Sequence, residues 1–276
     1  MLVSLKTILD IAEAKKIAVG AFNVTGLEGL RAVIDAAESL GQPIIIQFAN
    51  AAHKEYISLD VIGPIMVSMA DRSSVPICVH LDHGENFEEI CNAIDLGFTG
   101  VMYDGSALPY EENAANTRAV VEIAHKYDVS VEAEIGSMGN DEAELKSCYT
   151  EPEDAERFVN DTDIDALACS FGTVHGIYLT APKLDIERIG HIKAKCKRPI
   201  VMHGGSGISD DDFKACIREG VRKINFYTYA AKYAGDAVRD AIAKNDGNVY
   251  FHDIATIGMN SMIETYKNTI KVFSDL

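Results

Sequence analysis

Basic side chains are scarce in this sequence. Its 276 residues include 25 lysines and arginines against 42 aspartates and glutamates, which gives a formal net charge of −17 and a pI near 4.8. A protein that binds a nucleic-acid backbone needs clustered lysine and arginine to displace the counterions of the phosphates. We therefore expect no nucleic-acid partner. Any phosphate that the protein binds should be small and held by backbone N–H groups and a few side chains.

Long apolar runs and paired cysteine motifs are also missing. No segment approaches the roughly 20 apolar residues of a membrane span, and residues 1–16 are amphipathic and lack the apolar core of a signal peptide. Cysteines without C-x-x-C spacing are typical of reduced thiols in a cytoplasmic protein. The sequence therefore predicts a cytoplasmic protein without a membrane partner. The six cysteines are Cys78, Cys91, Cys148, Cys169, Cys196 and Cys216.

Short apolar, β-rich runs alternate with amphipathic helical segments from Ala18 to about Lys244, without a Pro-, Gly- or Ser-rich linker. Eight such units predict an α/β fold, the (β/α)8 TIM barrel. A doubly wound fold is disfavoured because no Gly-x-Gly-x-x-Gly opens the first unit. With 47% hydrophobic residues, the length suits a single domain over residues 1–276, in which 251–275 adds a C-terminal helix or helix pair. The expected strands span residues 18–24, 43–49, 76–82, 100–105, 130–136, 164–172, 199–205 and 223–228.

Polar side chains gather at the carboxyl ends of these strands, where barrels of this kind carry their active sites. Imidazole and carboxylate groups suit Zn²⁺, and a site with three histidines leaves a coordination position open for a substrate. The run Asp82, His83, Gly84 would by itself fit an ordinary hydrogen-bonded turn equally well. The predicted metal site therefore depends on the three histidines and one glutamate that end four of the strands. The whole polar set is Asn23, Asp82, His83, Asp104, Glu134, His175, His203, Asn225 and Thr228.

Two glycine-rich stretches lie beside two of those histidines, FGTVHG at 171–176 and MHGGSG at 202–207. Late in a barrel, such stretches present backbone N–H groups to a phosphate, and Ser206 can add a hydroxyl; tight turns alone are the alternative. The stretch 136–154 is too long for an ordinary connection between a strand and a helix. We interpret it as a lid that brings Asp141 or Glu142 over the site, or else as a solvated acidic loop.

Together these residues resemble the class II ketose-bisphosphate aldolase family of zinc-dependent enzymes, which split or join ketose phosphates with dihydroxyacetone phosphate as one partner. The motifs AFNV, HLDHG, MYDGS, VEAEIG, GTVHG, HGGSG and KINFYT follow the family's order and spacing over nearly the whole chain. The resemblance implies Zn²⁺ and a monovalent cation (Na⁺ or K⁺) as cofactors, a small phosphorylated sugar as substrate, and a homodimer or homotetramer.

The resemblance also implies a role for each site residue. His83, His175 and His203 would be the zinc ligands, and Glu134 and Asp104 further carboxylates of the metal site. Asp82 would take the proton of the substrate's C4 hydroxyl, and Glu142 would be the loop acid that protonates C3. The residues around the substrate would be Asn23, Gly176, Gly204, Ser206, Asn225 and Thr228.

The aldehyde side departs from the family pattern. Many members have Ser at Ala49, a cation at Leu179, and Asp or Ala at Tyr227, and no clear Arg lies near residues 247–258. The expected reaction is the reversible cleavage of fructose 1,6-bisphosphate or tagatose 1,6-bisphosphate. The alternatives are the same chemistry on a different aldehyde, such as a deoxy, keto-acid or sulfonated sugar phosphate, and a non-catalytic sugar-phosphate-binding barrel. Arg239 or Lys244 of a neighbouring subunit is a candidate distal cation.

Three further residues are interpreted as lying outside the chemistry. Lys223 is expected at the N-terminal end of its strand and therefore away from the active face, which argues against a Schiff-base aldolase. We interpret His80 as a hydrogen-bonded residue of the barrel interior and His53 as a structural loop residue.

Overall fold

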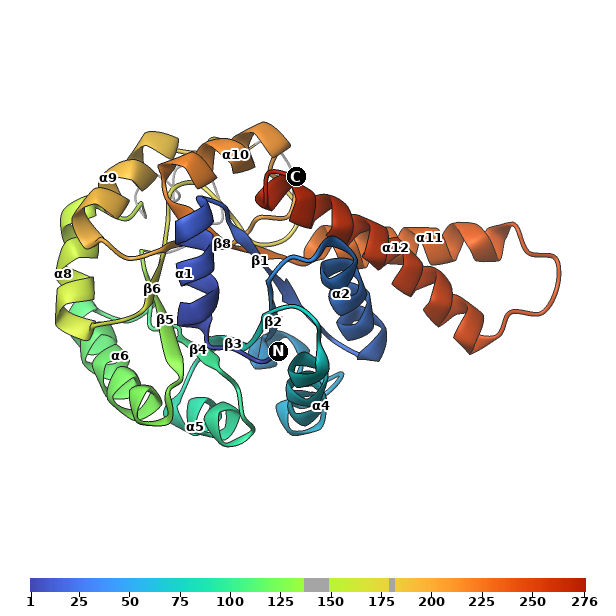
Figure 1. Cartoon of the computed structure of the whole chain (residues 1–276), viewed down its shortest axis with the longest axis horizontal. Helices are drawn as coiled ribbons and strands as arrows, with labels where there is room; N and C mark the ends of the chain where they lie inside the picture. The colour runs from blue at the N-terminus through green and yellow to red at the C-terminus, as the bar shows by residue number, and fades with distance from the viewer. Residues whose placement is uncertain (137–148, 179–181) are drawn as a thin grey trace.

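The chain folds into a closed barrel of eight parallel strands surrounded by helices (Figure 1). The computed structural model describes residues 1–136, 149–178 and 182–276. Each strand pairs with the next along the chain and β8 pairs with β1, so the sheet closes on itself and the predicted (β/α)8 barrel is confirmed. The strands are β1 Val19–Asn23, β2 Ile44–Phe48, β3 Ile77–Gly84, β4 Gly100–Tyr103, β5 Ser130–Ile135, β6 Ala166–Cys169, β7 Ile200–Met202 and β8 Val221–Phe226.

The helices pack their apolar faces against the outside of the barrel and form the larger of two buried apolar clusters with it. Several of them begin at a side chain that accepts a hydrogen bond from the first helical turn, as Ser4, Asn86 and Ser209 do. The helices are α1 Leu5–Lys15, α2 Leu27–Leu40, α3 Asn50–His53, α4 Leu59–Arg72, α5 Phe87–Asp95, α6 Tyr110–Ala124, the 3₁₀ helix η1 His125–Tyr127, α8 Pro152–Thr162, α9 Ile186–Cys196, α10 Asp210–Glu219, α11 Thr228–Ala243 and α12 Phe251–Phe273.

The amino-terminal end of the barrel is closed by α1. Leu5, Ile8 and Leu9 are buried there and pack into a cluster with strand residues of the barrel interior such as Ile45 and Val201. The backbone N–H of Leu5 also donates to the carbonyl oxygen of Thr99 at 3.3 Å. Because this end is filled, the cavity described below opens at the carboxyl ends of the strands.

Strand β8 begins two residues earlier than the sequence predicts, which changes the position of Lys223. In the sequence, the charged pair Arg222 and Lys223 interrupts the apolar pattern at the start of this strand. The two side chains lie on opposite faces of the sheet, because successive strand residues alternate. Arg222 pairs with Glu13 outside the barrel, whereas Lys223 is completely buried in the interior. The expectation that Lys223 lies at the far end of the barrel is therefore wrong.

Helices α11 and α12 form a hairpin that extends well beyond the barrel at one side (Figure 1). The predicted C-terminal segment is thus a single long helix, and α12 packs along α2 and α11. At the far end of the hairpin, Val249, Tyr250 and Phe251 are exposed to 41%, 54% and 80%. Within the described residues, none of the helices is both long and apolar enough to cross a membrane.

Candidate active site at the barrel mouth

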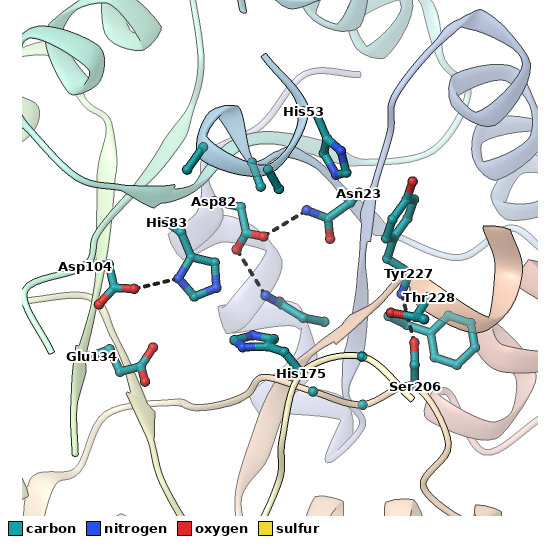
Figure 2. A pocket seen from close by; sticks show the side chains of 18 of the residues that line it. Asn23, His53, Asp82, His83, Asp104, Glu134, His175, Ser206, Tyr227 and Thr228 are labelled. Carbon is teal, nitrogen blue, oxygen red and sulfur yellow. Dashed lines mark hydrogen bonds and ion pairs between the residues drawn. The ribbon is translucent and has the colours of Figure 1, made fainter. Parts of the chain in front are cut away.

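A cavity of about 590 Å³ opens at the carboxyl ends of the strands (Figure 2). Almost every strand contributes a residue or the turn that follows it, as expected for the functional end of such a barrel. The cavity brings together the site residues predicted on β1, β3, β4, β5 and β8 and after β6 and β7. Its lining includes Asn23, Asp82, His83, Asp104, Glu134, His175, Gly176, Gly204, Ser206, Asn225 and Thr228.

Asp82 and His83 both line this cavity although they are neighbours in one strand. Successive strand residues normally point to opposite faces. Here the pairing of β3 with β4 shifts between Leu81 and Gly84, and His83 has φ = +51°. This left-handed conformation is uncommon for a residue with a side chain and is found mostly where the surroundings hold it, often at functional sites. The irregularity turns the imidazole of His83 toward the same space as the carboxylate of Asp82.

Three imidazoles face one another at this site, where His83 and His175 line the cavity and His203 is buried beside them. The ring centroids of His83 and His203 lie 4.7 Å apart, those of His83 and His175 5.1 Å, and those of His175 and His203 5.8 Å. One ring nitrogen from each lies within 4.8 Å of the others, so the three could hold one metal ion. Glu134 Oε2, 3.7 Å from His203 Nδ1, is a candidate additional ligand.

Carboxylates behind the imidazoles fix which nitrogen faces the cavity. Asp104 Oδ2 lies 2.7 Å from His83 Nδ1, and Glu132 Oε1 lies 2.9 Å from His203 Nε2. When these nitrogens donate, His83 Nε2 and His203 Nδ1 remain as metal ligands. His203 Nδ1 and Glu134 Oε2 are both buried without a hydrogen-bond partner in the described structure, which fits a bound cation. The donor set therefore suits Zn²⁺.

The charges around the imidazoles favour a cation. Burial raises the pKa of Glu134 to about 7, and the carboxylate of Asp104 contributes. Burial lowers the pKa of His83, but Asp82, Asp104 and Glu134 outweigh it and raise the pKa to about 9. His175 has its pKa lowered to about 4 by burial and by the neighbouring imidazoles. The site thus binds a proton strongly at His83, where a metal ion would take its place.

Asp82 is held by two amide groups. Asn23 Nδ2 donates to Asp82 Oδ2 at 2.8 Å, and Asn225 Nδ2 donates to Asp82 Oδ1 at 3.1 Å. Burial raises the pKa of Asp82, but the charges of His83 and Lys223, among others, more than offset this, so the pKa lies well below its ordinary value. Asp82 is therefore an ionised, oriented carboxylate beside the imidazoles, which suits the acceptance of a proton from a ligand.

The turn after β7 and the start of α11 form a cradle for an anion. At Gly204 φ is +67°, and a Cβ atom there would lie 2.3 Å from the carbonyl oxygen of Val174. Ser206 Oγ accepts a hydrogen bond from the backbone N–H of Tyr227 at 3.2 Å, and Thr228 opens the 16-residue helix α11 beside it. Glycine-rich turns and helix N-termini present N–H groups to phosphates.

The opposite side of the cavity, at the ends of β2, β3 and β4, is lined largely by small side chains, with the acids Asp104 and Glu85 among them. His53 is part of this lining and is the last residue of α3, so the expectation that it lies in a loop is wrong. Its ring meets that of Tyr227 edge to face, with centroids 5.3 Å apart. No lysine or arginine lines the cavity in the described part of the chain. The other lining residues on this side are Ala49, Ala51, Ala52, Glu85, Ser106 and Ala107.

The other predicted residues lie outside the described part of the chain or in the barrel interior. Asp141, Glu142 and Leu179 lie outside the described residues. His80 is buried in the interior as predicted, but neither ring nitrogen has a hydrogen-bond partner in the part of the chain that the structure describes. The sequence interpretation missed Glu132, although its spacing of two from Glu134 in a strand places both on one face. It also missed Gln47, which is buried in the barrel interior and donates a hydrogen bond to Asn23.

Comparison with known proteins gives matches along the whole chain. The family described as fructose-bisphosphate aldolase class-II matches residues 3–275. The fructose-bisphosphate aldolase of Staphylococcus aureus strain Mu50 is 38% identical over 279 residues, covering 99% of this chain and 97% of that protein. The crystal structure of the YdjI aldolase from Escherichia coli K12 superposes with a TM-score of 0.89 at 34% identity, covering 99% and 97% of the two chains. The fructose-bisphosphate aldolase of Campylobacter jejuni gives a TM-score of 0.82 at 26% identity, covering 99% and 95%.

Proposed function

The chain belongs to the class II fructose-bisphosphate aldolase family, and on that premise we propose that it catalyses the reversible, zinc-dependent cleavage of a ketose phosphate into dihydroxyacetone phosphate and an aldehyde. Fructose 1,6-bisphosphate and tagatose 1,6-bisphosphate are the proposed substrates. The observation that carries the proposal is that one cavity holds three facing imidazoles, the ionised Asp82 and a glycine-lined cradle. A non-catalytic barrel would need neither the proton acceptor nor the open metal position.

Cleavage breaks the C3–C4 bond of the ketose. The proton of the C4 hydroxyl passes to Asp82 while the C4–O bond becomes the carbonyl of the aldehyde. The electron pair of the broken bond stays on the dihydroxyacetone phosphate fragment, where C3 then takes up a proton. Asp141 or Glu142, outside the described residues, is the proposed source of that second proton.

The other side chains hold the reacting groups in place. Zn²⁺, when bound by His83, His175 and His203, supplies a Lewis acid that lowers the cost of negative charge on the ketone fragment. Asn23 and Asn225 keep the carboxylate of Asp82 oriented, and the cradle at Gly204 and Ser206 receives the 1-phosphate. Glu134 is proposed as an additional ligand. Asp104 is proposed at the metal as well, although its contacts in the structure favour the role of orienting His83.

An imine mechanism would need a lysine in contact with the substrate. Lys223 Nζ instead donates to Asn225 Oδ1 at 2.8 Å and lies 2.9 Å from Glu132 Oε2, beneath the cavity. We therefore expect a chelator to abolish cleavage, Zn²⁺ to restore it, and borohydride with substrate to leave the enzyme active. Covalent trapping of substrate by borohydride would contradict the proposal.

Variants of single residues separate ligand from proton acceptor. His83→Ala, His175→Ala or His203→Ala should each remove the metal, whereas Asp82→Ala should keep it and lose about 10²- to 10⁴-fold in rate. The measurement is zinc content by atomic absorption beside the rate of ketose cleavage. Loss of zinc from Asp82→Ala would show that the division of roles is wrong.

A different aldehyde is a second candidate, because the lining opposite the cradle carries Glu85 and no described cation. A distal phosphate would there lose charge-assisted hydrogen bonds of about 1.5–3 kcal/mol each. The comparison of fructose 1,6-bisphosphate with fructose 1-phosphate decides between the candidates. A preference of about 10³ or more in kcat/KM for the bisphosphate would exclude the second one.

Three further parts of the proposal concern the surroundings of the enzyme. We propose a homodimer or homotetramer, for which the exposed apolar end of the α11–α12 hairpin is the candidate contact. We also propose the cytoplasm as the compartment, in keeping with the five cysteines that are free in the described residues. A monovalent cation, Na⁺ or K⁺, is proposed beside Zn²⁺ on the family resemblance alone.

A further inference from the structure

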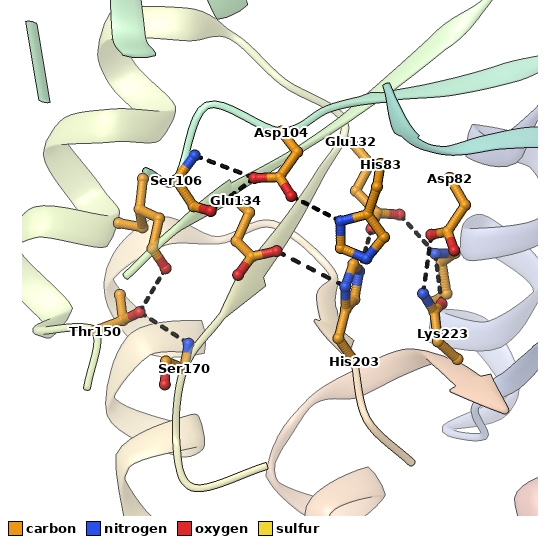
Figure 3. A network of polar contacts seen from close by, with 12 residues as sticks. Asp82, His83, Asp104, Ser106, Glu132, Glu134, Thr150, Ser170, His203 and Lys223 are labelled. Carbon is orange, nitrogen blue, oxygen red and sulfur yellow. Dashed lines mark hydrogen bonds and ion pairs between the residues drawn. The ribbon is translucent and has the colours of Figure 1, made fainter. Parts of the chain in front are cut away.

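A chain of buried polar contacts runs beneath the cavity and connects Asp82 with His203 (Figure 3). Asp82 accepts from Asn225 Nδ2, and Asn225 Oδ1 accepts from Lys223 Nζ at 2.8 Å. Lys223 Nζ lies 2.9 Å from Glu132 Oε2, and the other oxygen of Glu132 lies 2.9 Å from His203 Nε2. The proposed proton acceptor is thereby linked to a proposed metal ligand through an ion pair.

The ion pair at the centre of this chain is costly to bury. Lys223 and Glu132 are both completely buried, and removing two charges from water can cost more than their attraction returns. An apolar pair of similar volume would serve the packing of the barrel interior equally well. The pair therefore needs an explanation other than stability, and its contacts supply one.

Lys223 determines which way the amide of Asn225 points. An amide has one acceptor oxygen and one donor nitrogen, and Lys223 can only donate to the oxygen. The nitrogen is then directed at Asp82. Without that donor, the amide could rotate and present its oxygen to the carboxylate, which would repel it. Gln47 acts on Asn23 in the same way, because Gln47 Nε2 donates to Asn23 Oδ1 at 2.9 Å while Asn23 Nδ2 donates to Asp82.

Glu132 determines the orientation and tautomer of His203. Its Oε1 is 2.9 Å from His203 Nε2, so the proton on Nε2 is favoured and Nδ1 is left for a metal ion. Lys223 in turn balances the charge of Glu132. One buried pair thus controls both the amide beside Asp82 and the imidazole at the metal.

We propose that Lys223 and Glu132 are positioning residues that orient Asn225 toward Asp82 and His203 toward the metal. This inference rests on the proposed aldolase function, and it separates two steps of that reaction. Proton transfer at the C4 hydroxyl needs an oriented Asp82. Exchange of the C3 proton of dihydroxyacetone phosphate with solvent needs the metal site and the loop acid, but not Asp82.

The test uses two double variants, because removing one charge alone would leave its partner buried and unpaired. In Lys223→Met with Glu132→Gln, the glutamine oxygen can still accept from His203, while Asn225 loses its donor. We expect this variant to retain zinc and KM, to exchange the C3 proton at nearly the parent rate, and to cleave the ketose about 10- to 100-fold more slowly.

In Lys223→Met with Glu132→Leu, His203 loses its acceptor as well. We expect an additional loss of about 10- to 100-fold in zinc affinity, measured by competition with a fluorescent chelator. The matched control is Arg222→Met, which removes a charge from the outer face of the same strand. It should leave both the ratio of cleavage to exchange and the zinc affinity unchanged.

Three outcomes would overturn the inference. The first is an unchanged ratio of the cleavage rate to the C3 exchange rate in Lys223→Met with Glu132→Gln. The second is an equal zinc affinity in the two double variants. The third is a change of the rate ratio in Arg222→Met as large as that in Lys223→Met with Glu132→Gln. A parent protein that neither cleaves ketose phosphates nor exchanges the C3 proton would instead refute the aldolase function. The difference in zinc affinity would then still test the role of Glu132.

Discussion

At the scale of single residues, a metal ion bound at the barrel mouth would compete with protons for the same atoms. The charges of Asp82 and Asp104 outweigh the effect of burial and raise the pKa of His83 to about 9, and burial raises that of Glu134 to about 7. A metal ion held by these groups would have to displace whatever protons they carry. One proton would be displaced from His83 below about pH 9, and a second from Glu134 below about pH 7.

We therefore predict that zinc affinity rises with pH in two regimes. It should rise about tenfold per pH unit around pH 8, and the slope should approach a hundredfold per unit below about pH 6. Competition titration with a chelator of known pH dependence measures this. Glu134→Gln is the control, since it should reduce the lower slope to about tenfold per unit and, by removing a charge that raises the pKa of His83, lower the pH at which the upper regime ends. A single slope in the parent protein would contradict the interpretation.

At the scale of elements, the turns after β6 and β7 are fitted closely to each other. Tyr178 Oη accepts from the backbone N–H of Val174 and donates to the carbonyl oxygen of Gly204, both at 2.9 Å. A Cβ atom at Gly204 would collide with the Val174 carbonyl, whereas one at Gly176 would meet nothing within 4 Å. Both glycines have positive φ, so an alanine at either position would carry the same kind of backbone strain. Only the alanine at Gly204 would also clash with a neighbouring atom.

This pair gives a matched test of the cradle. Gly204→Ala should raise KM for a ketose 1-phosphate by about 10- to 100-fold, because the turn must move away from the anion. The KM of Gly176→Ala should stay within about tenfold of the parent value, because this variant carries only the strain of the left-handed conformation. Steady-state kinetics on the two variants measures the difference. Equal effects would mean that the close fit of the two turns does not matter for phosphate.

The elements also show what the sequence can and cannot predict. Alternation of apolar runs with helical segments is enough for the barrel, because each parallel strand is buried on both faces and reads as one apolar run. That same rule misplaces Lys223, since a charge within a run is taken to mark its edge. The adjacent Asp82 and His83 could be predicted as site residues by type, but not as partners on one face. Their shared direction depends on the shift between β3 and β4.

At the scale of the whole molecule, the α11–α12 hairpin differs from the barrel in charge as well as in shape. Residues 228–276 hold five basic and six acidic side chains, so they account for only −1 of the net charge of −17. Little of the like-charge repulsion between two copies of so acidic a chain therefore arises in this segment. Its end carries the exposed Val249, Tyr250 and Phe251.

We therefore predict that a second copy of the chain packs on the end of this hairpin. Phe251→Asp should lower the mass measured by light scattering toward that of the monomer and leave the circular dichroism of the barrel unchanged. Tyr127→Asp, a change at an exposed aromatic residue of η1, is the control and should leave the mass unchanged. An unaltered mass in Phe251→Asp would place the contact elsewhere.

The closure of the barrel by α1 affects the route and the order in which products would leave the cavity. With the amino end filled and charged residues packed beneath the cavity, both products of the proposed cleavage would leave through the mouth at the carboxyl ends of the strands. The ketone phosphate would be held by the metal and the cradle, whereas the aldehyde would touch mainly small side chains. The aldehyde should then depart first, and a cell rich in dihydroxyacetone phosphate would keep the entrance occupied. Because this product would leave last, its concentration in the cell would limit the turnover rate of the enzyme.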